Sequence, residues 1–563
     1  MPTSYPHLLL VYPEFPKTYW GMQYSLPLFG KKALMPPLGL LTIAAMTPPD
    51  YEVRLVDLNC TPLTDDDLAW ADMVCFSAML PQKRSLFDTA SRCQQLGKLV
   101  VFGGPFPTAC AEECRPYCDV QVLNEGEVTW PLFLDDLAHG TYKRLYTSDE
   151  KPDVTTTPIP RFDLLQPEDY AIIPIQFSRG CPFQCEFCDI IVMFGRRPRT
   201  KTPQQFCAEL QAVYDTGYRG VVFIVDDNFI GNKREAKRLL PALQAWNEAH
   251  GQPFMYGTEA SINLADDPAF LRQLVDCQFR WVFVGLETPS IESLQETMKY
   301  QNTKRSLLES VQVIQNAGLL VYGGFIIGFD HDTEDIFDRQ IEFITQAAIS
   351  NAMVGLLVAL PGTPLYKRLQ EAGRLQPAAS EGNSDQCGYT NIVTRLPARQ
   401  LLEGYRKVID TLYTPHAYFT RSLDAFCRLP HPDSRLARMR RVLSLQRTNA
   451  MFLLRRLRAQ KRAPGRPGPL RKLTFLYRLF QGLSAEYKRE SLKFLWSVLK
   501  QCPDQFPRVI PCIFMGIHYS RFSFEHVLPA LDHSLADLPA EGQAPDTSSD
   551  GCVAPRTAAD SRG

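Results

Sequence analysis

Three cysteines, Cys181, Cys185 and Cys188, lie within eight positions of one another in the stretch CPFQCEFC, with the spacing CxxxCxxC. Thiolates are soft ligands that select zinc or iron–sulfur clusters. A structural zinc site needs a fourth Cys or His, and the histidines nearest in sequence are the distant His139 and His250. Three thiolates can instead hold three irons of a [4Fe–4S] cluster and leave the fourth iron open to an exogenous ligand. The spacing favours such a cluster, and zinc with a distant fourth ligand stays open.

The cysteines follow a strand that opens a series of alternating strands and helices. The strand-like runs are AIIPIQFSRG, GVVFIVDDNF, FMYGTEAS, WVFVGLETPS, LLVYGGFIIGF and VGLLVALPGTP. Six or so unbroken βα units predict an open or closed (β/α) barrel over residues 171–395. Since ligands bind at the carboxyl ends of barrel strands, we expect the cysteines at the barrel mouth, where a cluster acts as a reagent.

An earlier alternating series, over residues 1–144, predicts a doubly wound parallel sheet, so the fold class is α/β. Such sheets bind ligands at the carboxyl ends of their strands. Those ends carry Asp57, Ser77, Met79, Gly103, Gly104, Glu125, Gly126 and Glu127. A dinucleotide site needs GxGxxG after the first strand, whereas this chain has YPEFPKTYWG there, which argues against dinucleotide binding.

The remaining segments are assigned by composition. Residues 145–170, rich in Pro, Thr and Asp, are predicted to be a linker. From residue 396 the pattern is helical and rich in arginine, which predicts a basic helical C-terminal domain over 396–534. The polar stretch 535–563 is predicted to be a disordered tail.

The bulk properties limit the class of protein. The chain has 563 residues, of which 45% are hydrophobic, so it can form several domains with large cores. Its net charge of −1 argues against a protein that is wholly a nucleic-acid binder. We find no signal peptide and no apolar run near the ~18 residues that span a bilayer. We therefore expect a cytoplasmic protein with reduced thiols, in which clustered cysteines are metal ligands or redox centres.

With the aromatic Phe187 just before its last cysteine, CPFQCEFC resembles the signature of radical S-adenosylmethionine (SAM) enzymes. The resemblance extends from about residue 172 to residue 366. It implies a [4Fe–4S] cluster on the three cysteines, SAM on the open iron, and a 5′-deoxyadenosyl radical that abstracts hydrogen. It also implies SAM-binding residues, which are Phe187, Asp226, Asp227, Asn228, Glu259, Ser261, Glu287, Ile327 and Gly328. A carboxylate suits the methionine ammonium, although acids after a strand are also common helix N-caps.

The N-terminal series also has a family likeness. PPLGLLTIAA, VRLVDLN, ADMVCFSAM, VVFGGPFPT and NEGE resemble, in order, the cobalamin-binding domain of class B radical SAM methyltransferases. The strand-end residues named above are then candidates to bind cobalamin. The DxHxxG motif that supplies a histidine to cobalt is absent, so the resemblance implies cobalamin without a protein histidine ligand. A Rossmann-like domain that binds nothing is the alternative.

An arginine run, FGRRPRTK, follows the cysteines directly. It is either a solvated loop or a source of charge balance near an anionic cofactor or substrate. CDIIVMFGRRPRTKTP and the C-terminal TNIVTRLPARQLLEGYRKVIDTLYTPHAYF resemble a subgroup that includes hopanoid C-2 methylases and bacteriochlorophyllide methyltransferases, which act on large apolar molecules. The arginine-rich helices would then bind anionic lipid headgroups, although a solvated basic bundle explains them equally well.

Together these features predict a cobalamin-dependent radical SAM methyltransferase. It would move a methyl group from methylcobalamin to an unactivated carbon of a large apolar substrate, either a hopanoid-like lipid or a tetrapyrrole. A cyclisation or rearrangement without methyl transfer, and a non-catalytic iron–sulfur sensor, stay open as alternatives. The expected partners are the apolar small-molecule substrate, a one-electron donor such as flavodoxin or ferredoxin, and peripherally the inner face of the membrane, but not nucleic acid. No catalytic residue beyond the cluster is predicted.

Overall fold

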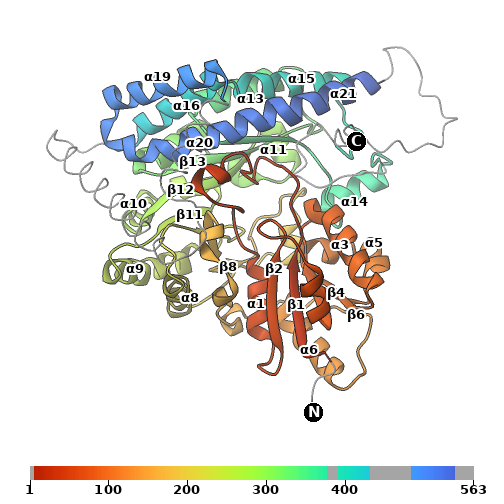
Figure 1. The fold of residues 1–563 in the computed structure, drawn as a ribbon. Coiled ribbons are helices and arrows are strands. Elements are labelled where there is room, and N and C mark those ends of the chain that lie inside the picture. The colour runs from red at the N-terminus through yellow and green to blue at the C-terminus, as the bar shows by residue number, and fades with distance from the viewer. Residues whose placement is uncertain (1–4, 377–389, 431–482, 539–563) are drawn as a thin grey trace.

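Two parallel sheets and a layer of helices make up the computed structural model, which describes residues 5–376, 390–430 and 483–538. The first sheet lies next to one side of the second, and the C-terminal helices lie on the other side (Figure 1). This α/β architecture, with a doubly wound domain, a barrel sheet and a helical C-terminal region, is the one that the sequence predicts.

The N-terminal sheet has six parallel strands in the order β2-β1-β3-β4-β5-β6. They are β1 His7–Tyr12, β2 Glu52–Asp57, β3 Met73–Ser77, β4 Leu99–Gly103, β5 Val120–Val122 and β6 Leu145–Tyr146. Alternate residues of a strand point to opposite faces. In β1, Leu9 and Val11 therefore join one apolar core, and Leu8 and Leu10 join a second core on the other face. Burial on both faces explains why these strands read as unbroken apolar runs.

Helices cover both faces of this sheet. They are α1 Leu38–Met46, α2 Asp65–Trp70, α3 Lys83–Gln95, α4 Pro105–Ala109, α5 Ala111–Cys114 and α6 Gly126–Ala138. Residues of α1 and α6 share one core, and residues of α2, α3, α4 and α5 share the other. The carboxyl edge of the sheet is thereby left to the loops that follow its strands.

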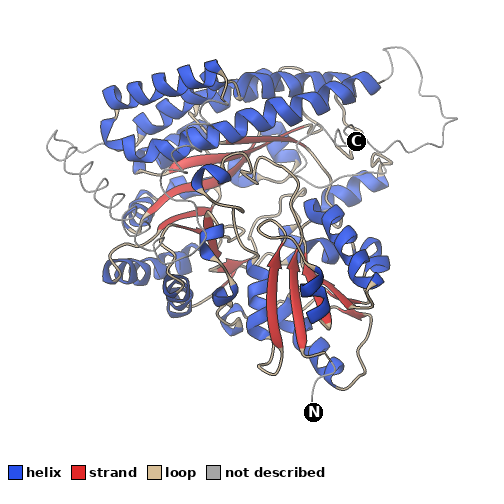
Figure 2. Cartoon of the chain, viewed as in Figure 1, coloured by secondary structure: helices blue, strands red, loops and turns tan. Residues whose placement is uncertain are grey.

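The barrel sheet also has six parallel strands, in the order β14-β13-β12-β11-β10-β7. The strands are β7 Ile172–Ile175, β10 Val221–Ile224, β11 Met255–Glu259, β12 Phe279–Glu287, β13 Leu320–Ile327 and β14 Ala352–Leu356. The helices are α8 Pro203–Asp215, α9 Lys233–Ala249, α10 Pro268–Asp276, α11 Ile291–Glu296, α12 Leu307–Ala317, α13 Ile336–Gln346 and α14 Pro364–Glu371. Because β7 and β14 lie at the two ends of this order, the barrel is open between them (Figure 2).

The segment expected to be a linker is more ordered than its composition indicates. Residues 145–170 begin with β6, which pairs with β5, and continue through short 3-10 turns in which Phe162 and Tyr170 are buried. Just beyond it, the Ala171 amide donates to the Ala33 carbonyl at 3.1 Å, and the Ile172 amide donates to the Leu34 carbonyl at 2.9 Å. The N-terminal domain thus covers the free edge of β7, which an open barrel leaves exposed.

Within the described residues after 390, five helices and a π-helical turn form the helical layer. The elements are α15 Ala398–Leu412, α16 Pro415–Arg428, α19 Ala485–Gln501, α20 Phe506–Phe522, the π-helical turn Ser523–Val527 and α21 Leu528–Asp537. The loop after β1 reaches this layer, where Tyr19 stacks on Tyr413 with ring centroids 5.0 Å apart. The buried His518 donates from Nε2 to the Thr18 carbonyl at 2.9 Å. The first and last parts of the chain are therefore packed together.

The predicted tail falls largely, and the predicted basic helical domain partly, outside the described residues. The predicted tail spans residues 535–563, and the structure describes it only as far as Leu538. Helix α21 continues through the first residues of this segment and ends at Asp537. Of the basic helical domain predicted over 396–534, residues 431–482 are not described. The side chain of Arg421 is fully buried and donates to the Leu412 carbonyl at 2.8 Å, so this arginine is structural. Among the helices described, none is long and apolar enough to span a bilayer.

Candidate functional site

The cysteine motif lies in a loop between the strands of a short antiparallel hairpin, β8 Ser178–Arg179 and β9 Arg199–Thr200. The loop begins at Gly180, which has a φ of +92°, and a Cβ there would come within 2.9 Å of the Gly195 carbonyl oxygen. The Cys181 amide donates to the same carbonyl at 3.3 Å. Only glycine fits this turn, and the turn holds the motif at the carboxyl end of β7.

The three thiols of the motif lie close enough to influence one another. Burial raises the pKa of Cys181 and Cys188; the Cys185 thiol raises the pKa of both further, and the Cys181 thiol also raises that of Cys188. Two amides point at sulfur: Asn228 Nδ2 lies 3.9 Å from Cys181 Sγ, and Gln301 Nε2 lies 3.5 Å from Cys185 Sγ. In the described parts of the chain, no three His, Cys, Asp or Glu side chains surround one metal position. A [4Fe–4S] cluster needs no such grouping, because each thiolate binds a different iron, so the donor set fits it.

An acidic residue inside the motif anchors the loop. Glu186 is buried, and its carboxylate accepts from Arg368 of α14, with Nη2 to Oε1 at 2.5 Å and Nε to Oε2 at 3.2 Å. Arg368 also bonds Asp330, which pairs with Arg374 at 2.6 Å. The hydrogen bonds from Arg374 and Arg368 lower the pKa of Asp330. This series of charged side chains connects the cysteine loop to the end of β13 and to α14.

Two acids at the end of β10 brace the backbone that leads into the motif. Asp226 is buried, and its carboxylate accepts from the Phe177 amide at 2.7 Å and the Ser178 hydroxyl at 2.6 Å. Asp227 accepts from the Gly180 amide at 2.8 Å. Both side chains therefore have structural partners, and their predicted contact with SAM stays a prediction.

The carboxylate of a third acid, Glu259 at the end of β11, has no hydrogen bond or ion pair with any residue that the structure describes, although the Glu259 backbone carbonyl accepts from the Phe229 amide at 2.9 Å. Burial raises its pKa to about 8, and the negative charges of Asp227 and Asp226 add to the effect. Burial likewise raises the pKa of Asp226 to about 7 and that of Asp227 to about 6. A cation bound among the three carboxylates would offset the free-energy cost of burying their negative charges. The three acids therefore suit the positive charges of SAM.

The other predicted SAM residues lie around the same opening of the barrel. Asn228 accepts from the Ser261 amide at 3.2 Å, which ties β11 to the residue that points at the first thiol. Glu287 ends β12 with a φ of +64° and forms an ion pair with the buried Lys299. The Lys299 ammonium lies 5.6 Å from the centre of the Phe187 ring. A positive charge therefore reaches the aromatic residue of the motif.

The end of β13 is a tight turn against the C-terminal helices. Ile327 is fully buried, and Gly328 has a φ of +109°, which explains the glycine. The Gly328 amide donates to Asp332 at 2.8 Å, and a Cβ on Gly328 would lie 3.7 Å from Leu401. The predicted contact of Ile327 and Gly328 with adenine stays a prediction.

Neighbouring protein atoms lie close to the glycines at the carboxyl edge of the N-terminal sheet. Gly104 has a φ of +88°, and a Cβ there would come within 2.3 Å of the Ser77 hydroxyl. A Cβ at Gly103 would lie 2.9 Å from a carbonyl oxygen of β5, and one at Gly126 would meet a side chain of α1 at 2.6 Å. Met79, next along this edge, is 47% exposed. Glycine is therefore required at these positions because a side chain would collide with neighbouring protein atoms, and the contact of this edge with cobalamin stays a prediction.

Asp57, at the end of β2, is occupied by neighbours. Its carboxylate accepts from the Asn59 amide at 2.9 Å and from the Tyr170 hydroxyl at 3.0 Å. Burial raises the pKa of Asp57, and these hydrogen bonds partly oppose that rise. Its contact with cobalamin stays a prediction, and its observed partner, Tyr170, comes from the segment just before β7.

A buried group of four charges, which we call the interdomain clamp, joins the N-terminal sheet to the hairpin that holds the cysteine motif. Its members are Glu125 and Glu127 after β5, Arg179 in β8 and Arg199 in β9. Arg199 donates to Glu125 through Nη1 at 2.9 Å and Nη2 at 2.8 Å. Arg179 bonds Glu125 at 2.9 Å and Glu127 at 2.7 Å. Burial alone would raise the pKa of Glu127, but the hydrogen bonds and charge of Arg179 lower it to about 2.

The clamp explains part of the arginine run FGRRPRTK. The side chain of Arg199 is 13% exposed and faces the other domain, whereas Arg196 and Arg197 are exposed. It also gives Glu125 and Glu127 protein partners, so their role toward cobalamin stays a prediction. The sequence analysis did not single out Arg179 as a functional residue, although it stands two residues before the first cysteine.

Three other residues near the motif were missed for different reasons. Arg368 lies on a helix far along the chain and has no motif of its own. Lys299 and Gln301 lie in the stretch MKYQN, whose composition gives no signal of a role. Their importance comes from the turn after α11, which brings them to Phe187 and Cys185.

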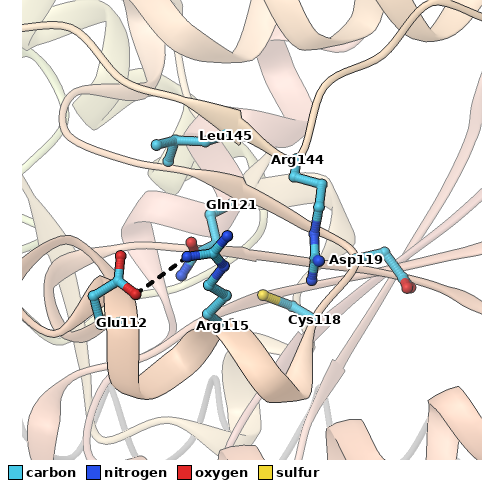
Figure 3. A pocket seen from close by; sticks show the side chains of 7 residues that line it. All are labelled: Glu112, Arg115, Cys118, Asp119, Gln121, Arg144 and Leu145. Carbon is cyan, nitrogen blue, oxygen red and sulfur yellow. Dashed lines mark hydrogen bonds and ion pairs between the residues drawn. The ribbon is translucent and has the colours of Figure 1, made fainter.

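A separate pocket lies on the N-terminal domain beside β5 and β6. Its lining includes Glu112, Arg115, Arg144 and Cys118, and Figure 3 shows the ion pair between Glu112 and Arg115 at 3.3 Å. None of the predicted site residues lines it. This pocket is therefore distinct from the carboxyl edges of both six-stranded sheets.

Three family models match successive parts of the chain. A B12 binding domain matches residues 32–134, the radical SAM superfamily matches residues 175–344, and a domain of unknown function (DUF4070) matches residues 363–528. In order, they correspond to the N-terminal sheet, the barrel sheet and the C-terminal helices.

Curated relatives span most of the chain. It is 45% identical over 430 residues to an uncharacterised methyltransferase of Synechocystis sp., covering 76% of this chain and 80% of that protein. It is 37% identical over 418 residues to the hopanoid C-2 methylase of Rhodopseudomonas palustris, covering 74% and 78%. It is 26% identical over 359 residues to the bacteriochlorophyllide d C-8(2)-methyltransferase of Chlorobaculum tepidum, covering 60% and 76%.

Two solved structures have a similar fold. The cobalamin-dependent SAM radical enzyme OxsB, solved with aqua-cobalamin and SAM, aligns with a TM-score of 0.56 at 14% identity, covering 95% of this chain and 84% of that one. The radical SAM methyltransferase TsrM from Kitasatospora setae, solved with cobalamin and a [4Fe–4S] cluster, aligns with a TM-score of 0.53 at 14% identity, covering 66% and 76%. At this identity the likeness concerns the fold.

Proposed function

The chain belongs to the cobalamin-binding radical SAM methyltransferases, and from this premise we propose that it transfers a methyl group to an unactivated carbon of a large apolar molecule. The observation that carries the proposal is the interdomain clamp. It joins the carboxyl edge of the N-terminal sheet to the hairpin that holds the cysteine motif. Two groups that act on one substrate must be held at a fixed separation, and a buried charged contact between their domains supports that.

The residues of the chain have separable tasks in this proposal. When bound, the cluster would supply the electron that cleaves SAM, and cobalamin would carry the methyl group. Cys181, Cys185 and Cys188 would hold the cluster. Asp226 and Asp227 would keep the loop in place, and Glu259 would meet a positive charge of SAM. No protein histidine is expected on cobalt.

The substrate class is inferred from relatives. The hopanoid C-2 methylase and the bacteriochlorophyllide methyltransferase act, by their names, on a hopanoid and on a chlorophyll-type pigment. We propose that the substrate here is likewise a hopanoid-like lipid or a tetrapyrrole. A one-electron donor such as flavodoxin or ferredoxin completes the proposed set of partners.

The test uses full-length protein reconstituted anaerobically with iron, sulfide and cobalamin, then supplied with SAM, a reductant and either a hopanoid or a tetrapyrrole. The expected products are 5′-deoxyadenosine and a substrate heavier by one CH₂ unit. Cys185→Ala should abolish 5′-deoxyadenosine formation, whereas Cys207→Ala, a half-buried cysteine on α8 outside the motif, should not. Retained cleavage in Cys185→Ala contradicts the cluster assignment.

The same assay separates the alternatives. A converted substrate of unchanged mass, formed together with 5′-deoxyadenosine, indicates a rearrangement, and a changed mass without an added CH₂ unit indicates another radical reaction. A reconstituted, reduced protein that makes no 5′-deoxyadenosine at all indicates a non-catalytic iron–sulfur protein.

A further inference from the structure

Helix α19 exposes a stripe of large apolar side chains. Leu492, Trp496 and Leu499 are 59%, 61% and 45% exposed. Their spacing of four and three residues places them on one face of the helix. The buried residues of the helix, such as Phe494 and Val498, face the core instead. The stripe is therefore additional to the packing that holds α19 in place.

Basic side chains border this stripe. Lys500 lies over the Trp496 ring, with its ammonium 5.0 Å from the ring centre. Arg489 and Lys493 both pair with Glu490, whose side chain is only 7% exposed, while their own side chains are more than 60% exposed. The negative charge thus lies beneath the surface and the positive charges lie at it.

The surroundings of α19 strengthen the same pattern. The helix lies at the outer side of the helical layer, away from the N-terminal sheet (Figure 1). The chain that leads into it, residues 431–482, contains fourteen arginine and lysine residues against one acidic residue. A partner for this face therefore has to be anionic as well as apolar.

We propose that this face of α19, which we call the docking face, binds the surface of an anionic lipid bilayer. It consists of Leu492, Trp496 and Leu499 with Arg489, Lys493 and Lys500. Apolar side chains enter the boundary between headgroups and acyl chains, and each basic residue near the surface adds attraction. A tryptophan beside a lysine suits that boundary, where an amphipathic ring meets charged headgroups. A second copy of the chain fits less well, since a symmetric contact would bring like charges together.

The purpose of the docking face rests on the proposed function, because an enzyme bound to the bilayer would take an apolar substrate from it. Binding to lipid can be measured without catalysis. Full-length protein is sedimented with vesicles of phosphatidylcholine, alone or with about 30% phosphatidylglycerol, which gives a surface potential like that of anionic membranes. We expect binding to the mixed vesicles only, weakened as salt rises from about 0.1 to 0.5 M.

The decisive variant is Leu492→Ser with Trp496→Ser and Leu499→Ser. Because these side chains are exposed, the fold should survive, as circular dichroism can check. We expect about tenfold weaker vesicle binding. Leu96→Ser with Leu132→Ser, which removes residues 53% and 56% exposed on the N-terminal domain, should bind like the wild type. The tryptophan emission of the wild type should shift to the blue when the mixed vesicles are added, because Trp496 enters the bilayer. In Trp496→Phe this shift should largely disappear.

Several outcomes overturn the proposal. The first is that the wild type does not bind the mixed vesicles, and the second is that the triple variant binds them as tightly as the wild type does. The third is that the wild type is a dimer, the triple variant is a monomer, and neither protein binds vesicles. Binding to RNA instead of vesicles also overturns it. Methylation of a detergent-dispersed substrate separates the two proposals: it should be unchanged in the triple variant. If vesicles are bound but no substrate is methylated, the proposed function fails and the docking face stands.

Discussion

Replacing Arg199 by Gln removes one of the two arginines of the interdomain clamp. The side chain would lose its paired hydrogen bonds to Glu125 at 2.9 and 2.8 Å, and its bonds to the Pro152 carbonyl at 2.7 Å and the Phe194 carbonyl at 3.1 Å. Glu125, whose side chain is 1% exposed, would keep only Arg179 as a charged partner. We therefore expect both stability and the separation of the two domains to change.

The expected magnitude follows from the burial of the pair. Removing one partner of a buried ion pair costs about 3–5 kcal/mol, and because Arg179 remains we expect the lower end, about 3 kcal/mol. For a chain of 563 residues that unfolds as one unit, with about 2.1 cal/mol/K of unfolding entropy per residue, that lowers the melting temperature by roughly 2–3 °C. A displacement of about 1 Å between reacting groups costs about 100-fold in rate. The rate of methyl transfer should therefore fall about 100-fold. The rate of SAM cleavage, which needs only the barrel, should fall far less.

The assay measures methylated product and 5′-deoxyadenosine in the same reaction, with iron content per chain as a check on the cluster. The ratio of product to 5′-deoxyadenosine should fall steeply in Arg199→Gln. Arg199→Lys, which keeps the charge but not the paired geometry, should be intermediate. Arg197→Gln, an exposed arginine of the same run, is the matched control and should behave like the wild type. An unchanged ratio in Arg199→Gln would refute the positioning role, even if the protein melts earlier.

Two further predictions concern buried titratable groups. The pKa of Glu259 is raised by burial to about 8, so its ionisation destabilises the protein without SAM progressively between pH 4.5 and 8. Glu259→Gln should therefore raise the melting temperature at pH 9 but not at pH 4, and weaken SAM binding measured by calorimetry; equal effects at both pH values would contradict this. Burial lowers the pKa of His518 to about 4, so stability should be lost as pH falls from 6.5 to 4, by up to roughly 3 kcal/mol. Urea unfolding across this range should show a smaller loss in His518→Gln, and an identical loss would contradict the assignment.

Much of the fold could be predicted because parallel strands buried on both faces leave a strong pattern. Runs such as HLLLVY and VVFI have no polar interruption, and each is followed by the loop that carries chemistry. The short β6 was missed, since a two-residue edge strand has no periodicity to detect. The segment around Phe162 and Tyr170 has the polar composition of a linker, whereas these two aromatic residues are buried in the core shared with the barrel.

The site was predictable where a motif combines residue type with spacing, and not where contacts are made across the fold. The cysteine loop is local, so its spacing in the sequence is informative. Glu186 and Arg368 are 182 positions apart, and Glu125 and Arg199 are 74 apart. A single sequence contains no signal that pairs such residues. The acids of NEGE looked like ligand contacts for the same reason: their protein partners lie in another domain.

The position of the clamp also limits where a substrate can react. The carboxyl edge of the N-terminal sheet touches the barrel at two separated points: Asp57 bonds Tyr170 before β7, and Glu125 bonds Arg179 after it. That edge therefore contacts residues on either side of β7, the edge strand of the open barrel. Ligands of parallel sheets bind at carboxyl ends, and the clamp joins the carboxyl edge of the N-terminal sheet to the hairpin that follows β7. We expect a substrate that reacts with groups on both edges to bind at this junction, which makes the separation of the domains part of the reaction geometry.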